Sequence, residues 1–117
     1  MIRILWLHLF LFSCLTGLSQ EMQNWNQFRG NQQLTGVSDS RIPSNIEIKW
    51  TFHTGSQIKS SPVISGQRII IGSTNGNLYC LDLSGALLWK RQTGNAIDAP
   101  GMILKEKVYV GSLDGNI

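Results

Sequence analysis

The hydrophobic and polar positions of this chain repeat along the sequence. Residues 50–76 match residues 89–115 position by position, with an offset of 39 residues and no gap. The matched pairs include Trp50 with Trp89, Ile64 with Ile103, and Gly72 with Gly111. A fixed period that preserves residue types over this length indicates a repeat architecture.

The pattern inside the repeat predicts β-strands. Residues 46–52 alternate apolar and polar side chains, which is the period of a strand with one buried face. Residues 69–71 are continuously apolar, as expected for a strand that is covered on both faces. We therefore predict strands at 46–52, 58–65, 68–73, 77–83 and 86–92, and in the second repeat at 96–104 and 107–112.

Pairs of residues that contain glycine mark the turns between these strands, namely Asn75-Gly76, Ser84-Gly85 and Asp114-Gly115. Asparagine and glycine tolerate the positive φ angles that a type I′ turn requires at both central positions. We therefore expect a type I′ hairpin at Asn75-Gly76, and a turn at the equivalent Asp114-Gly115.

A period near 40 residues with four strands per repeat is typical of a β-propeller, in which each repeat forms one blade. The predicted fold class is therefore all-β, a β-propeller of four-stranded blades with one complete blade and parts of its neighbours. Propellers contain roughly four to eight blades, so we expect the 117 residues to be an N-terminal piece of a longer protein. The strand at 46–52 would then complete the last blade and close the ring, which removes an open edge. A complete small protein is the disfavoured alternative, because a lone blade is close to the size at which a core fails.

The N-terminal residues have the organisation of a secretory signal peptide. Arg3 precedes an apolar run that extends to Phe12, and small and polar residues follow it. Cleavage after Ser19 divides the chain into a signal peptide at 1–19, a polar segment at 20–45 and repeats at 46–117. The alternative is lipidation at Cys14, which would attach the protein to a membrane. In both cases the protein is exported, to the periplasm or the extracellular space.

Charge and cysteine content restrict the function further. The formal net charge is +3, and it falls to about +2 when the segment containing Arg3 is removed. This small and evenly spread charge argues against nucleic acid or an anionic membrane as a partner. Cys80 is the one cysteine outside the leader, so we expect a small buried residue rather than a reactive thiol.

Two aromatic residues stand out in the polar segment at 20–45. Trp25 and Phe28 lie among glutamine, asparagine and serine residues. We expect them to pack against the rim of the propeller, because large aromatic side chains gain stability from burial. The alternative is a contact with a ligand or a partner protein.

Residues 78–90 resemble the repeat of PQQ-like β-propellers, which ends in a tryptophan-docking motif. In this motif a small residue, an aspartate, a turn with glycine and a tryptophan follow at set spacing. The matching residues are Cys80, Asp82, Gly85 and Trp89, with Trp50 in the preceding repeat. This copy is one residue shorter between Asp82 and the turn than the family pattern. Residues 25–30 also resemble an opening found in secreted bacterial members. The resemblance implies that these residues are structural docking and turn residues.

The resemblance implies one of two functions. The first is a non-catalytic binding scaffold without a cofactor, whose partners are other envelope proteins. The alternative is a quinoprotein alcohol or sugar dehydrogenase that depends on PQQ and calcium. A calcium site needs several converging oxygen ligands, and the acidic residues here are scattered. Asp98 is the carboxylate that we expect to face the central channel, and a metal pair of His53 with Asp98 is disfavoured. We therefore favour the scaffold and predict no catalytic or metal-binding residue in these repeats.

Overall fold

The computed structural model describes residues 24–117, so the predicted signal peptide and Cys14 lie outside the described residues. Within this range the protein is all-β, with antiparallel sheets and no helix. A search of the same residues for a helix able to cross a membrane finds none.

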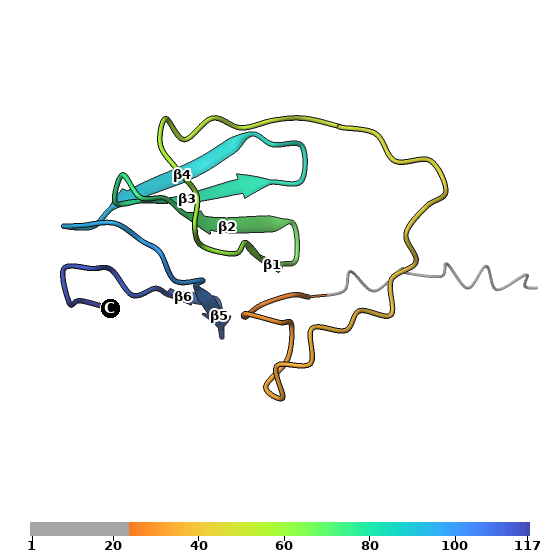
Figure 1. The fold of residues 1–117 in the computed structure, drawn as a ribbon, viewed down its shortest axis with the longest axis horizontal. Helices are drawn as coiled ribbons and strands as arrows, with labels where there is room; N and C mark the ends of the chain where they lie inside the picture. Colours follow the sequence, from red (N-terminus) through yellow and green to blue (C-terminus); the bar gives the residue numbers. More distant parts are fainter. Residues whose placement is uncertain (1–23) are drawn as a thin grey trace, which may run out of the picture.

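Four consecutive strands form the larger sheet in the order β1-β2-β3-β4. They are β1 (Val63–Ser65), β2 (Arg68–Gly72), β3 (Asn77–Asp82) and β4 (Leu87–Gln92). Each strand pairs antiparallel with the next one in the chain, so the sheet is a simple meander (Figure 1). The strands predicted at 68–73, 77–83 and 86–92 are present to within about one residue at each end.

The first strand of this sheet is shorter than predicted. It begins at Val63, although the sequence pattern predicted a strand from residue 58. The Ser60 hydroxyl donates to the carbonyl of Gly72 at 2.8 Å and accepts from its N–H at 3.1 Å. A side chain therefore satisfies the Gly72 backbone groups that a longer β1 would have paired, and the ladder stops at Val63.

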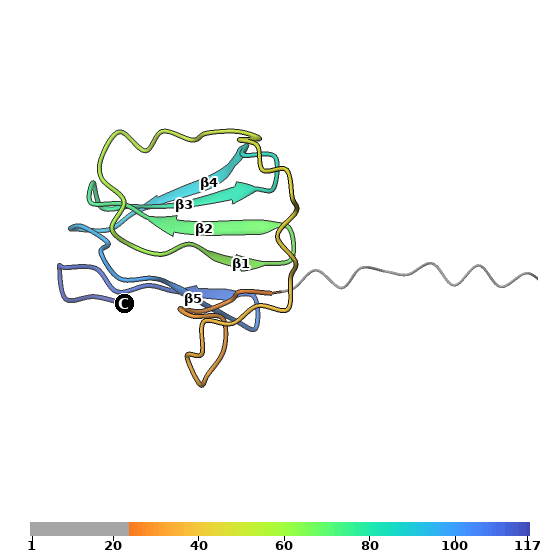
Figure 2. The ribbon, with the colours of Figure 1, turned by 45° about the vertical axis from the view of Figure 1, so that its right-hand side comes forward.

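The second repeat supplies a two-stranded sheet of β5 (Met102–Leu104) and β6 (Lys107–Tyr109). Both strands are shorter than the predicted ranges of 96–104 and 107–112. The β5–β6 hairpin lies next to β1, so the two sheets are neighbours in both views (Figures 1 and 2).

The strand predicted at 46–52 is not formed, since these residues have no ladder partner in the part of the chain that the structure describes. Ile46 and Ile48 are 76% and 85% exposed, so half of the predicted apolar face is not buried. Phe52 does pack, with its ring centroid 5.4 Å from that of Tyr79. An alternating pattern favours an extended backbone, but a strand also needs a neighbour in register.

The core joins the two sheets. Its fully or nearly buried members come from β1, β2, β3 and the start of the second repeat: Val63, Ile70, Leu78, Cys80 and Ile97. Trp89, Ile103, Val108 and Val110 pack against this cluster. Ile97 lies directly over Gly72, where a Cβ atom would overlap its Cγ2 atom. Glycine at this position therefore allows the second repeat to pack closely against β2.

The 39-residue period is also present in the backbone hydrogen bonds. The Thr74 N–H donates to the Gln57 carbonyl at 3.0 Å, and the Leu113 N–H donates to the Ala96 carbonyl at 2.9 Å. The same correspondence holds for the turns closed by Gly76 and by Gly115, each with a bond of 3.1 Å. Equivalent residues thus build equivalent local structure in the two repeats.

The N-terminal segment connects the two sheets. Trp25 forms an antiparallel bridge with Ile64 of β1, with two hydrogen bonds of 2.8 Å. The next carbonyl, that of Asn26, accepts from the Ile103 N–H of β5 at 2.7 Å. Trp25 is half-buried, as expected, whereas Phe28 remains 44% exposed beneath the Arg29 guanidinium. Backbone pairing therefore positions this segment more than aromatic burial does.

Candidate functional site

Asp82 holds the turn between β3 and β4. One oxygen of its carboxylate accepts from the Ser84 hydroxyl at 2.6 Å, the Ser84 N–H at 2.8 Å and the Ala86 N–H at 3.0 Å. These hydrogen bonds, led by that from the Ser84 side chain, lower the pKa of Asp82 below its ordinary value. Gly85 closes the turn with a φ of +86°. The carboxylate is thus occupied by its own turn.

Trp50 from the preceding segment lies on this turn. Its indole N–H donates to the Leu83 carbonyl at 2.9 Å. Its ring covers Gly85 so closely that a Cβ atom there would come within 2.5 Å of ring atom Cδ2. The fold therefore brings together three of the singled-out residues, Trp50, Asp82 and Gly85.

Trp89 and Cys80 occupy a different environment, in the core. They are opposite each other in the β3–β4 ladder, and Trp89 packs against the buried cluster. Cys80 is 0% exposed and is a free cysteine, as expected. Burial raises the pKa of its thiol, which disfavours the nucleophilic thiolate.

Asn75 and Asp114 are equivalent turn residues with equivalent contacts. The Asn75 amide donates to the Thr54 carbonyl at 2.8 Å, and its oxygen accepts from the Asn77 N–H. Asp114 accepts from the Asn116 N–H at 3.0 Å and from the Gly94 N–H at 2.6 Å. These backbone donors, Asn116 first, lower the pKa of Asp114. Both side chains therefore anchor the loop that enters their own repeat.

The predicted type I′ hairpin at Asn75-Gly76 is wrong in its turn type. Gly76 has a φ of +78°, but Asn75 does not have a positive φ angle. The Gly76 N–H closes a turn to the Ser73 carbonyl, which leaves one left-handed glycine after the turn. The Ser73 N–H also donates to the Asn77 carbonyl at 3.0 Å, so the loop inside this pair has three residues, 74–76. The side chain of Asn75 holds the loop backbone through its hydrogen bonds, and it does so without a left-handed backbone at Asn75.

Lys59 and Asp98, which are 39 residues apart, form an ion pair. The Lys59 ammonium lies 3.2 Å from one Asp98 oxygen, with side chains that are 58% and 30% exposed. The other oxygen of Asp98 is buried and has no hydrogen-bond partner among the described residues. Asp98 therefore pairs with Lys59 rather than with His53. Within residues 24–117 no group of three or more His, Cys, Asp or Glu side chains could hold a metal ion.

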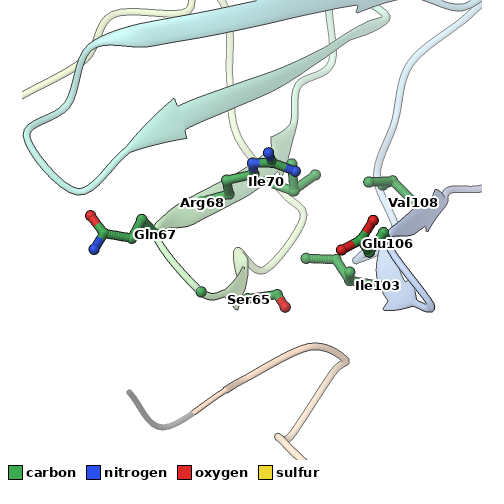
Figure 3. A pocket seen from close by; sticks show the side chains of 8 residues that line it. Ser65, Gln67, Arg68, Ile70, Ile103, Glu106 and Val108 are labelled. Atoms are coloured by element: carbon green, nitrogen blue, oxygen red, sulfur yellow. The ribbon is translucent and has the colours of Figure 1, made fainter. Parts of the chain in front are cut away.

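A cavity of about 380 Å³ lies between the β1–β2 hairpin and the β5–β6 hairpin. Its lining combines charged, polar and apolar side chains: Ser65, Arg68, Ile70, Ile103, Glu106 and Val108. Figure 3 shows that Arg68 and Glu106 reach it from different hairpins. We call it the interhairpin cavity.

A second cavity, of about 390 Å³, lies between the N-terminal segment and β5. Its walls carry several carboxamide side chains and the apolar residues of β5: Asn26, Gln27, Asn31, Gln32, Met102 and Leu104. Ile103 contributes to both cavities. Carboxamides offer both donors and acceptors, so this cavity suits a neutral polar ligand.

The sequence reasoning did not identify Arg68 or Glu106. A signal was present in the repeat, since Gly66 in the first hairpin corresponds to Lys105 in the second. The tight turn at 105–106 is therefore built without glycine, with φ angles of +48° at Lys105 and +63° at Glu106. The lost glycine therefore marks this strained turn, although Lys105 itself does not line the cavity.

A scan of the chain against protein-family models finds no match, and a search of curated proteins finds no significant relative.

Proposed function

We propose that this chain belongs to an exported PQQ-like β-propeller protein, and that it acts as a non-catalytic binding scaffold for other envelope proteins. The propeller interpretation rests on the repeated sequence pattern, the four-stranded meander and the matching hydrogen bonds of the two repeats. The contact of Trp50 with the turn at Gly85 supports it, since it joins one repeat unit to the next.

The observation that favours a scaffold is the use made of the polar side chains. Asp82, Asn75 and Asp114 all hold backbone turns, and Cys80 is buried with a raised pKa. None of these four residues lines either of the two cavities described above. Because these side chains stabilise the fold, they provide a rigid surface whose loops are available for protein contacts.

One observation, a single buried carboxylate oxygen, favours the alternative, a dehydrogenase that depends on PQQ and calcium. The buried oxygen of Asp98 without a partner is the kind of ligand that calcium accepts. Calcium takes roughly six to eight oxygen ligands, and the other Asp98 oxygen is paired with Lys59. The described residues therefore do not fit a calcium site by themselves.

The test is a titration of the purified full-length protein with PQQ and Ca²⁺, followed by quinone absorbance and melting temperature. A ligand that binds the native state raises the melting temperature by mass action. We expect no bound quinone and no shift. A clear shift with bound quinone would replace the scaffold by the dehydrogenase.

The scaffold itself is tested by cross-linking in intact cells, with the cross-linked peptides identified by mass spectrometry. We expect reproducible cross-links from lysines of the repeats, such as Lys90 and Lys105, to envelope proteins. A protein that forms no intermolecular cross-links and sediments as a free monomer in envelope extracts would contradict the proposal.

A further inference from the structure

The interhairpin cavity presents two opposite charges across an apolar floor. Arg68 begins β2, and Glu106 lies in the turn between β5 and β6. The floor consists of Ile70, which is 2% exposed, and the half-buried Ile103 and Val108. Figure 3 shows Ile103 and Val108 on the same side of the cavity as Glu106.

Within residues 24–117, neither of these two charged side chains has an ion-pair partner. Among the residues that the structure describes, the one ion pair joins Lys59 to Asp98. No hydrogen bond joins the side chain of Arg68 or Glu106 to another described residue. A guanidinium and a carboxylate that line one cavity without pairing can each bind a group of opposite charge on a ligand.

The backbone gives a second and independent reason to single out Glu106. Its φ is +63°, in the left-handed region where a side chain costs conformational energy and glycine does not. Its counterpart in the first hairpin is Gln67, which has no positive φ angle, so the left-handed backbone at Glu106 is not part of the repeat pattern. A glycine at residue 106 would avoid this strain, but it would lack the carboxylate that lines the cavity.

We propose that the interhairpin cavity binds a small zwitterion with an apolar side chain, such as an aliphatic α-amino acid. The ligand carboxylate pairs with the Arg68 guanidinium, and the ligand ammonium pairs with the Glu106 carboxylate. The aliphatic side chain lies on Ile70, Ile103 and Val108. A volume of about 380 Å³ is at the small end of ligand sites, which suits an amino acid. The site adds a small-molecule ligand to the proposed scaffold and does not depend on that function.

The experiment is a calorimetric titration of the full-length protein with L-leucine. We expect a dissociation constant of about 1 mM, typical of a ligand with so few atoms. Isocaproate lacks the ammonium group and isoamylamine lacks the carboxylate, so each should bind at least about tenfold more weakly. Equal binding of leucine and isocaproate would show that Glu106 has no role and would overturn the proposal.

Two glycine substitutions distinguish a loss of leucine binding from a loss of folding stability. Lys105→Gly and Glu106→Gly both relieve a left-handed side chain, so neither should lower the melting temperature. Lys105 does not line the cavity, so Lys105→Gly should retain leucine binding. Glu106→Gly should lose it by about tenfold or more, and Arg68→Gln should lose it to a similar extent. If Glu106→Gly binds leucine as well as the wild type does, the proposal is wrong.

Discussion

The Trp50 ring covers Gly85, and this contact joins the segment that precedes β1 to the turn between β3 and β4. A Cβ atom on residue 85 would lie 2.5 Å from Cδ2 of the indole, and the φ of Gly85 is +86°. Glycine is therefore required at this turn for two separate reasons. One is the left-handed backbone, and the other is the space taken by the ring.

Gly85→Ala should destabilise the protein by about 3 kcal/mol, because the left-handed strain and the clash with Trp50 add. The control is Gly66→Ala, since Gly66 has a φ of +56° and no atom within 4 Å of its would-be Cβ. That change should cost about 1 kcal/mol from strain alone. Urea denaturation of the full-length variants measures both values.

A double-mutant cycle isolates the clash. In the Trp50→Ala background, Gly85→Ala should cost no more than Gly66→Ala does, because the ring is gone. An unchanged cost in that background would mean that the ring does not constrain residue 85.

Gly72 and Ile97 give a second prediction of this kind, at the junction of the two repeats. Gly72→Ala should cost about 2 kcal/mol, because the new methyl group overlaps the Ile97 side chain in a fully buried site. The repeat supplies the control, Gly111→Ala, which has open space around its would-be Cβ. We expect that variant to lie within about 0.5 kcal/mol of the wild type. Equal melting temperatures for the two variants would contradict the described packing.

The sequence predicted the strands from β2 to β4 well because two signals agree there. The apolar run of Ile69 to Ile71 favours an extended, covered strand, and glycines mark both turns that follow. Where one side chain replaces a backbone partner the pattern fails, as at Ser60, which ends β1 early. The residues at 46–52 carry the strongest alternation and form no strand, since alternation does not provide a partner.

The candidate site was harder to predict than the fold. Gly85 could be singled out because it marks a turn, and Asp82 was singled out by the resemblance to the PQQ-like repeat motif. Arg68 and Glu106 share no motif, and they meet at one cavity only because the two hairpins lie side by side. The change from Gly66 to Lys105 between the repeats marks the turn next to Glu106, but Lys105 itself does not line the cavity.

Ser60 should be essential for stability although it is a small polar residue. It is 6% exposed, and its hydroxyl satisfies both the N–H and the carbonyl of Gly72. Ser60→Ala leaves two buried backbone groups unpaired and should cost about 2 kcal/mol. The control is Ser56→Ala, an exposed serine whose hydroxyl bonds to Thr74, and it should change stability by less than about 0.5 kcal/mol. Thermal denaturation of both variants measures the difference, and equal stability would mean that water replaces the hydroxyl.

Acid should weaken the turns of both repeats. The pKa values of Asp82 and Asp114 are lower in the folded protein than the ordinary value of 3.8. A carboxylate with a depressed folded pKa stabilises the fold fully above its unfolded pKa, and this contribution disappears as the pH falls through the folded pKa. The loss therefore begins near the ordinary value and continues below it. Asp82→Asn removes the titrating group at one turn, so the variant should lose less stability than the wild type between about pH 6 and about pH 3.

Asp114→Asn should have the same effect at the second turn, and the double variant should have the flattest profile. Asparagine keeps an oxygen that can accept the turn hydrogen bonds, so both variants should still fold at neutral pH. Urea midpoints at the two pH values measure the loss for each protein. If the wild type and Asp82→Asn lose the same stability over this range, the hydrogen bonds from Ser84 and Ala86 do not favour the charged carboxylate, and the turn is held by its backbone geometry alone.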